Sequence, residues 1–252
     1  MRAITDSATM LRRQVKHIWR YPSLILTFAA VPVVFLLLFV YVFGGTMGAG
    51  IGGDRTAYAG YLTPGIMITT IAGAAQGTAI SVATDMAEGI IARFKTMAIA
   101  RVSVLTGHVL GAMVQTFIAI AVVTGVAVLI GFRPSASAPA WLGVVGVLVM
   151  FTFAITWLSV ALAMVSKSVT TASNLPMPLM TLPFLGSGFV PTESMPTGLR
   201  WFAEHQPFTS VIETLRALLT GRPAGSSFVE AAVWSAVIAL AGYLWARRLY
   251  NR

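Results

Sequence analysis

The side chains that could do chemistry in this sequence are few and scattered. Its three histidines, His17, His108 and His205, lie in separate segments, and it has no cysteine, so neither a metal site nor a reactive thiol is predicted. It contains no G-x-x-x-x-G-K-[ST] phosphate loop, no H-E-x-x-H and no G-x-S-x-G. We therefore predict no catalytic residue, no metal ligand and no cofactor bound by this chain, and we expect that it cannot hydrolyse ATP alone.

One charged segment, DMAEGIIARFKTMAIAR at residues 85–101, has the pattern of a docking helix. Ile90, Phe94 and Met97 recur at i, i+4 and i+7 and form one apolar face. Charged residues such as Glu88 lie beside that face. An apolar anchor with a charged rim suits a groove on a soluble partner. A surface helix whose apolar side rests on lipid is the alternative.

Three uncharged polar residues, Gln76, Gln115 and Asn174, interrupt stretches that are otherwise apolar. Amides inside a membrane usually hydrogen-bond across helices, so helix packing is one role for them. Lining the path of a substrate is the other. No acidic residue falls in the middle of such a stretch, whereas ion-coupled carriers usually need one there.

The elements that position these residues are long apolar runs. The chain is 57% apolar and 10% charged, against about 25% charged residues in an average soluble domain. A helix needs about 20 apolar residues to cross a bilayer, and in lipid only helices or closed barrels satisfy their own backbone groups. Because the runs are continuous rather than alternating, we predict an all-α polytopic membrane protein with six transmembrane helices, at Ser23–Phe43, Ala59–Thr84, Val104–Gly131, Ala140–Val165, Val169–Val190 and Val229–Ala246.

Charge predicts how these six spans are oriented. With six crossings, one face of the membrane collects a net charge of +9 and the other a net charge of zero. The positive-inside rule places the +9 face in the cytoplasm, with both termini there. The basic composition therefore indicates topology and contact with anionic lipid heads of the plasma membrane rather than binding of nucleic acid.

The segments between the spans have distinct patterns. Residues 1–22 are predicted to form an amphipathic interfacial helix, either an anchoring basic flank or a mechanical elbow. The glycine-rich stretch Gly44–Asp54 is expected to be a flexible external connector. Prolines interrupt span five, which we expect to be distorted or broken. Residues 191–228 fit two short helices that dip into the outer leaflet better than another span, because their charges would be costly at mid-bilayer.

Two stretches carry a resemblance to a known family. The first is EGIIARFKTMAIAR, Glu88 to Arg101, and the second is GFVPTESMP, Gly188 to Pro196, with HQPFTSVIETLRALLTG, His205 to Gly221, further along the chain. With the order of the six spans, they make the chain similar to the permease subunit of type-2 ABC exporters, of the daunorubicin and doxorubicin resistance type. One departure is Ala98, where the family commonly has proline.

The resemblance implies a single permease domain over residues 1–252, with spans one to five in 23–190 and span six with a cytoplasmic tail in 229–252. It also implies two ABC ATPase subunits on separate chains, which hold ATP and Mg, and a second permease copy or paralogue. Site roles follow from the same resemblance: coupling to the ATPase by Glu88, Gly89, Arg93, Phe94 and Met97, and an external gate that includes Phe189, Pro191, Glu204 and Arg216.

The apolar spans favour a hydrophobic or amphipathic substrate such as a drug, a natural product or a lipid, since they offer few fixed charges to recognise a polar solute. Two other readings stay open on the residues alone. One is a self-contained secondary carrier or channel, which the missing mid-span charge disfavours. The other is an accessory membrane subunit that lines no path.

Overall fold

The computed structural model describes residues 22–90 and 101–250, and the side chains of residues 29–90 and 105–250. The interfacial helix predicted for residues 1–22 therefore lies outside the described residues, and so does most of the predicted docking helix. Every regular element in the described part is helical, which confirms the all-α prediction.

Five helical stretches in this part of the chain are long and apolar enough to cross a membrane. The first is composite, because α2 (Pro22–Leu38) runs through a π-helical turn at Phe39–Phe43 into α3 (Gly44–Gly50). The other four are α4 (Arg55–Ala87), α6 (Arg101–Leu129), α7 (Ala138–Val165) and α12 (Gly225–Tyr250). These four extend the predicted spans by a few residues at most ends, because polar residues that the hydropathy pattern leaves out continue or cap the helices.

Short polar side chains start the long helices and are satisfied inside them. Asp54 precedes α4, and its carboxylate accepts a hydrogen bond of 2.8 Å from the Ala57 amide. Ser137 does the same for α7. Within α4 the hydroxyl of Thr63 donates to the carbonyl of Ala59 at 2.7 Å, so a polar residue is accommodated in a buried helix.

The expectation of a flexible connector at Gly44–Asp54 was wrong, since α3 continues the helix to Gly50. Gly44 and Gly48 are buried one turn apart, and α3 packs against α4. Glycine costs a helix about 1 kcal/mol relative to alanine. Here the two glycines have no side chain to keep α4 at a distance, and the close packing of α3 on α4 offsets that cost.

The predicted span Val169–Val190 is broken, as its prolines indicated. It forms α8 (Val169–Asn174) and α9 (Met177–Thr181), followed by turns up to residue 190. Pro176 and Pro183 lack the amide that a continuous helix would use at these points. The segment nevertheless packs along α4, so it follows the bundle without being one membrane-length helix.

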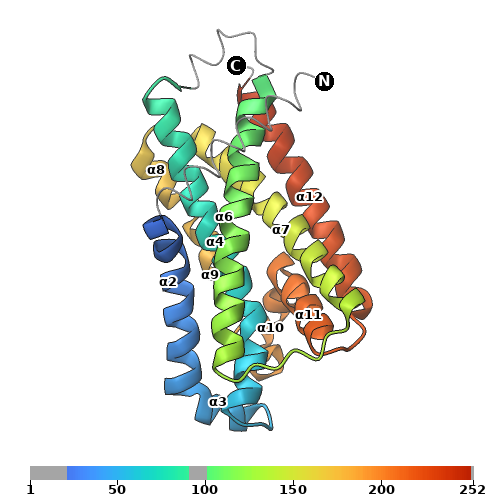
Figure 1. Ribbon diagram of the computed structural model, residues 1–252. Helices are drawn as coiled ribbons and strands as arrows, with labels where there is room; N and C mark the ends of the chain where they lie inside the picture. The colour runs from blue at the N-terminus through green and yellow to red at the C-terminus, as the bar shows by residue number, and fades with distance from the viewer. Residues whose placement is uncertain (1–21, 91–100, 251–252) are drawn as a thin grey trace.

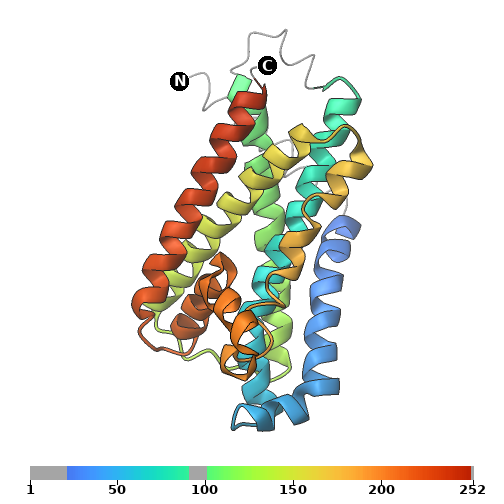
Figure 2. The same ribbon diagram turned by 180° about the vertical axis from the view of Figure 1, so that it is seen from behind.

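Helices α4 and α7 form the centre of the bundle, and α2, α6 and α12 lie around them (Figures 1 and 2). In α4 and in α7, two thirds of the residues in the most apolar stretch of the helix are buried, whereas in α12 only 17% are. Helix α4 contacts α2, α6, α7 and α8, and also the short helix α11 (Pro207–Leu219). It therefore touches most of the elements that carry the predicted site residues.

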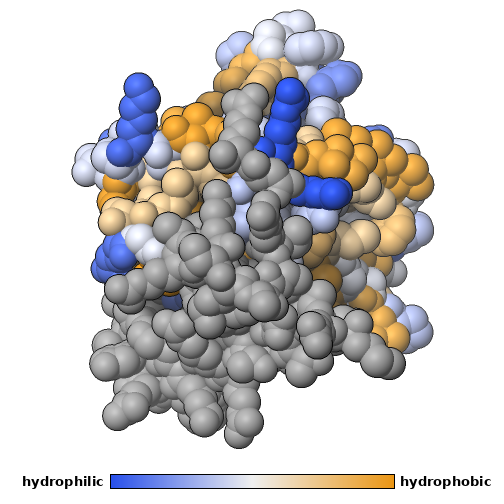
Figure 3. Space-filling view, turned by 90° about the horizontal axis from the view of Figure 1, so that it is seen from above, coloured by the Kyte–Doolittle hydropathy of each residue, from blue (hydrophilic) through white to orange (hydrophobic). Residues whose placement is uncertain are grey.

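The two ends of the bundle differ. Helices α4, α7 and α12 all have their C-terminal ends at the upper end in Figure 1, whereas α3, α10 (Thr197–His205) and α11 lie in the lower half. Figure 3 looks onto the upper end and shows long hydrophilic side chains standing between apolar ones. Arg247 and Arg248 in the last turn of α12 belong to this end.

Candidate functional site

Helix α11 is the element that builds the lower-end site. Its apolar side chains are buried, and Phe208 meets Phe151 of α7 edge to face, with 5.1 Å between ring centroids. Pro207 occupies the first turn, where its missing amide costs no hydrogen bond. At the other end of the helix the Leu219 carbonyl accepts a hydrogen bond of 3.0 Å from the Ser135 amide. Both ends of α11 are thus held, so its polar side chains are placed rigidly.

Arg216 of α11 is the most heavily bonded side chain at this site, although it is only 6% exposed. Its guanidinium lies 3.7 Å from the centre of the Tyr61 ring and pairs with Glu213 at 2.5 Å. It also donates to the carbonyl of Ser187 at 2.6 Å and to the carbonyl of Tyr61 at 3.3 and 3.4 Å. A buried cation with this many partners joins α11, α4 and the turns after α9.

Two tyrosines of α4 bind the same turns from the other side. The hydroxyl of Tyr58 donates to the carbonyl of Phe189, and that of Tyr61 donates to the carbonyl of Ser187, each at 3.1 Å. Close to them Gly65 packs directly on the backbone of Gly188, where an added Cβ would lie 2.3 Å from the Gly188 carbonyl oxygen. We call residues 182–190 the closing segment, and the two tyrosines with their carbonyl partners the tyrosine clamp.

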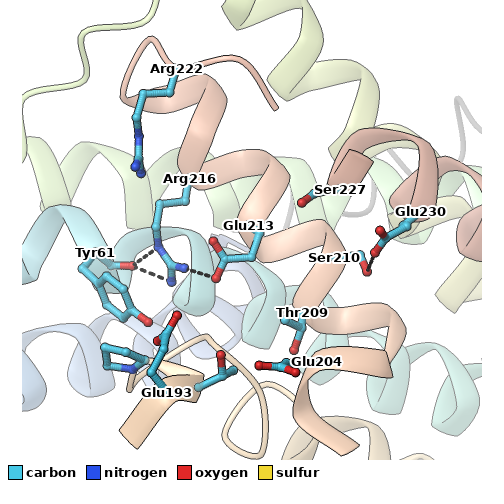
Figure 4. A pocket seen from close by; sticks show the side chains of 12 residues that line it. Tyr61, Glu193, Glu204, Thr209, Ser210, Glu213, Arg216, Arg222, Ser227 and Glu230 are labelled. Carbon is cyan, nitrogen blue, oxygen red and sulfur yellow. Dashed lines mark hydrogen bonds and ion pairs between the residues drawn. The ribbon is translucent and has the colours of Figure 1, made fainter. Parts of the chain in front are cut away.

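The predicted gate residues separate into two groups. Pro191, Glu204 and Arg216 line one cavity of about 420 Å³, shown in Figure 4. Phe189 lies apart from it among other aromatic rings. Its ring stacks on that of Phe184, with 4.2 Å between ring centroids, and is tilted against that of Phe39, with 4.9 Å between ring centroids. Arg216 and Phe189 are buried, but Glu204 is exposed. The structure thus brings three of the four residues together.

This polar cavity carries both signs of charge. Figure 4 shows Arg216 and Arg222 reaching in from one side, and the Ser210 hydroxyl donates to Glu230 at 3.1 Å on another. On its rim Arg200 and Glu204 form a 2.7 Å ion pair one helical turn apart, and this hydrogen bond raises the pKa of the Arg200 guanidinium. The lining residues are Tyr61, Pro191, Thr192, Glu193, Glu204, Thr209, Ser210, Glu213, Arg216, Arg222, Ser227 and Glu230.

A second, larger cavity of about 800 Å³ is lined by α2, α4 and the α8–α9 segment. Two of the three predicted path residues, Gln76 and Asn174, lie in its wall, whereas Gln115 of α6 is not part of it. The Gln76 amide donates to the Ser173 carbonyl at 2.9 Å, so it also has the packing role that the sequence left open. The lining residues are Val31, Pro32, Phe35, Thr69, Thr70, Gly73, Gln76, Asn174, Met177, Pro178, Met180, Thr181 and Phe184.

The predicted coupling segment is described only where it leaves α4. Glu88 is exposed, and Gly89 takes a left-handed conformation with φ of 71°, which ends the helix. Arg93, Phe94 and Met97 lie outside the described residues. Just before this exit Asp85 of α4 contacts His108 of α6, with 3.0 Å between the Asp85 Oδ2 and His108 Nε2 atoms. The two helices that flank the segment are therefore tied together at its base.

Sequence reasoning missed Tyr58 and Tyr61, although a signal was present. Both are amphipathic residues three positions apart in the first turns of a long apolar helix, and a tyrosine hydroxyl inside such a helix usually has a partner. Their partners are the carbonyls of Phe189 and Ser187, which lie more than 120 positions away in the sequence, so the local pattern could not identify them.

Comparison with known proteins agrees with this architecture. A family model described as ABC-2 type transporter matches residues 6–220. The chain is 29% identical, over 226 residues, to the daunorubicin resistance ABC transporter permease protein of Streptomyces coeruleorubidus, covering 85% of this chain and 77% of that protein. It is 26% identical, over 160 residues, to the probable doxorubicin resistance ABC transporter permease protein of Mycobacterium tuberculosis, covering 64% of this chain and 58% of that protein.

The family match extends over most of the chain and includes α4, α10 and α11, which line the polar cavity, and α2, α4 and the α8–α9 segment, which line the apolar cavity. The relatives are permease proteins of ABC transporters. The chain therefore belongs to the ABC-2 type transporter family, as a multi-pass membrane subunit of an ABC transporter.

Proposed function

We propose that this subunit is the permease of an ATP-driven exporter that moves hydrophobic or amphipathic molecules, and that the apolar cavity of about 800 Å³ is part of their path. The observation that carries this proposal is the lining of that cavity. No charged side chain is among its lining residues in the described part of the chain, and the polar groups there are hydroxyls and amides. Such a wall favours an apolar body with a few hydrogen-bonding groups.

The names of the two relatives suggest the kind of molecule. Daunorubicin and doxorubicin resistance are the properties stated for those proteins, and an amphipathic aromatic drug has the chemistry that this wall accepts. The same apolar lining extends this proposal to a natural product or a lipid of similar character.

Energy for transport comes from ABC ATPase subunits on separate chains, which hold ATP and Mg. We place their docking site at the upper end of the bundle, on the segment that leaves α4 at Glu88 and Gly89 and includes Arg93, Phe94 and Met97. The basic residues at the end of α12 support a cytoplasmic position for this end, with both termini inside. The lower end, with α10 and α11, is then external and forms the gate.

A second copy or a paralogue completes the path. The α8–α9 segment and the turns after it expose apolar side chains, among them Leu175, Met177, Phe184 and Leu185. Irregular backbone at membrane depth is tolerated against protein or a cavity, but not against lipid. A partner permease facing this side would cover it, and two ATPases would match the two permeases.

The test is ATP-dependent drug transport by the purified complex. The chain and the ABC ATPase that copurifies with it are reconstituted in liposomes, and doxorubicin fluorescence reports uptake into vesicles whose ATPases face outward. We expect uptake that needs ATP and Mg. Recovery of the chain with no ATPase, or uptake that is equal without ATP, would contradict the proposal and favour a self-contained carrier.

A matched pair of variants tests the cavity itself. Met177 lines it and is half exposed, so Met177→Lys introduces a charge with little disturbance of packing. We expect about a ten-fold loss of doxorubicin transport, since the apolar rings of the drug would have to desolvate the added ammonium group, which also repels the amine of the drug. Met177→Leu, which conserves volume and polarity, should keep transport within about two-fold. Equal transport by both variants would exclude this cavity from the path.

A further inference from the structure

Helix α4 runs from the lower end of the bundle to the upper end, over 33 residues (Figures 1 and 2). Its first turns carry Tyr58 and Tyr61, and its last turn leads into Glu88 and Gly89. One continuous helix, with Pro64 inside it, thus joins the tyrosine clamp to the segment that we propose as the ATPase docking site.

The backbone of the closing segment depends on donors from other elements. Residues 182–190 form turns rather than a helix, so some of their carbonyls lack the intrahelical partners that the long helices have. A buried carbonyl without a donor is costly, and more so where water is scarce. The hydroxyls of Tyr58 and Tyr61 supply donors to Phe189 and Ser187.

The two tyrosines are not equivalent. The Ser187 carbonyl also accepts a hydrogen bond from Arg216 of α11, so it keeps a donor if the Tyr61 hydroxyl is removed. The carbonyl of Phe189 is held by the Tyr58 hydroxyl. Burial of Phe189 between Phe184 and Phe39 places that carbonyl at the junction of the closing segment with the first span.

We propose that Tyr58 and Tyr61 are positioning residues that hold the closing segment against α4, so that displacement of α4 from its coupling end releases this segment. The inference rests on the proposed function for its direction, from ATPase to external gate. Hydroxyl–carbonyl hydrogen bonds suit this role, because they fix the closed arrangement and exchange readily with water when the segment moves. The elements around the clamp are packed rigidly, so a small shift of α4 is passed on rather than absorbed.

The absence of cysteine from the sequence makes a direct test possible. Ser187 is 1% exposed and its hydroxyl has no hydrogen-bond partner, so Ser187→Cys adds a unique thiol at little cost. The rate at which a sulfonated, membrane-impermeant maleimide labels this thiol in proteoliposomes, without ATPase, measures opening of the closing segment at rest.

We expect Tyr58→Phe to raise the labelling rate about five-fold, since one hydrogen bond contributes about 1 kcal/mol to the closed state. Tyr61→Phe should raise it less, because Arg216 remains bound to Ser187, and the double variant should raise it most. Tyr41→Phe is the matched control, because Tyr41 lies towards the same end and is 55% exposed.

A thiol on α11 shows whether the tyrosine variants release only the closing segment or loosen the packing of this end of the bundle in general. Ser210 is buried, lines the polar cavity and belongs to α11 rather than to the closing segment. With Ser210→Cys as the only thiol, the tyrosine variants should label at the unchanged rate. Faster labelling at both positions, or no change at Ser187→Cys in the double variant, would overturn the clamp.

Adding the ATPase with a non-hydrolysable ATP analogue tests the direction of the effect. We expect faster labelling of Ser187→Cys in the chain with both tyrosines. If the analogue changes nothing while the phenylalanine variants still label faster, the clamp stands and the ATP-driven exporter fails. If the analogue speeds labelling but the phenylalanine variants match the control, the exporter stands and the clamp fails.

Discussion

Helices α10 and α11 are neighbours in the sequence, each carries an arginine paired with a glutamate about one turn away, and they are used in opposite ways. Helix α10 buries only Ala203 and presents Leu199, Trp201 and Phe202 outward. Helix α11 buries most of its side chains against α4, α7 and α12. The two helices carry similar residue types but differ in burial. The position of a helix in the bundle, rather than its local sequence pattern, therefore decides which arginine–glutamate pair stabilises the fold.

The largest effect that would sharpen this comparison is expected from Arg216→Leu. The substitution removes a buried cation, takes away one of the two donors to the Ser187 carbonyl and leaves the Glu213 carboxylate without this partner. A hydrogen bond from a charged donor contributes about 1.5–3 kcal/mol, so losing those to the Ser187 and Tyr61 carbonyls should cost about 3–5 kcal/mol, whereas the Glu213 side chain is 40% exposed and is hydrated instead. We expect a marked fall in the thermal unfolding temperature of the detergent-purified subunit and loss of transport in the reconstituted complex. Arg216→Lys, which keeps the charge but loses the paired donors and the stacking on Tyr61, should recover part of the stability.

The apolar anchors give the next largest contrast. Phe208→Ala removes a ring that is 1% exposed and packs edge to face on Phe151, which should cost about 3 kcal/mol of unfolding free energy. Phe202→Ala on α10 removes a ring that is 40% exposed and should cost about 0.5 kcal/mol. Thermal unfolding of the two purified variants side by side measures the difference. Comparable losses would mean that α10 is covered in the assembled protein.

A glycine pair should separate the two helices by the sign of the effect. A Cβ on Gly186 would lie 2.5 Å from the side chains of Gln206 and Thr209, where α11 starts, whereas one on Gly198 of α10 meets nothing within 4 Å. Gly186→Ala should therefore destabilise by about 1–2 kcal/mol through overpacking. Gly198→Ala should stabilise by up to about 1 kcal/mol, because alanine favours a helix. Unfolding temperatures measured in the same detergent would show opposite shifts. Shifts of equal sign would contradict the close packing of Gly186 against the start of α11.

Much of this architecture could be predicted from the sequence, because the length of an apolar run is a local property. The spans that became α4, α6, α7 and α12 follow from it, and the prolines near Pro176 indicate the break after α8. Two short helices between the last two spans follow from helical spacing in residues 191–228, and the structure has them at residues 197–205 and 207–219.

The site depended on contacts that local patterns do not contain. Tyr61 and Ser187 are 126 positions apart and meet only when α4 and the closing segment pack together. Glu204 and Arg216 were grouped as gate residues because the family resemblance assigns the segment that holds both of them to the external gate. Burial of Arg216 and exposure of Glu204 then follow from tertiary packing, which turns α11 inward and leaves α10 on the surface.

The smallest effect is expected from the pair on α10, and it tests the comparison most directly. Arg200 and Glu204 form an ion pair as short as many buried ones, but both side chains are more than a third exposed. Such pairs contribute little, since water and salt screen the charges and two long side chains must be ordered. Arg200→Leu should therefore leave the unfolding temperature nearly unchanged, against the large fall for Arg216→Leu.

Transport should be equally insensitive to this pair. Glu204→Gln keeps a hydrogen-bond acceptor beside Arg200, so transport by this variant should stay within about two-fold of the unaltered subunit. A large loss of transport with normal unfolding in Glu204→Gln would show that this carboxylate acts in the polar cavity itself. The distinction between a structural α11 and a dispensable pair on α10 would then have to be replaced by one in which both helices form the gate.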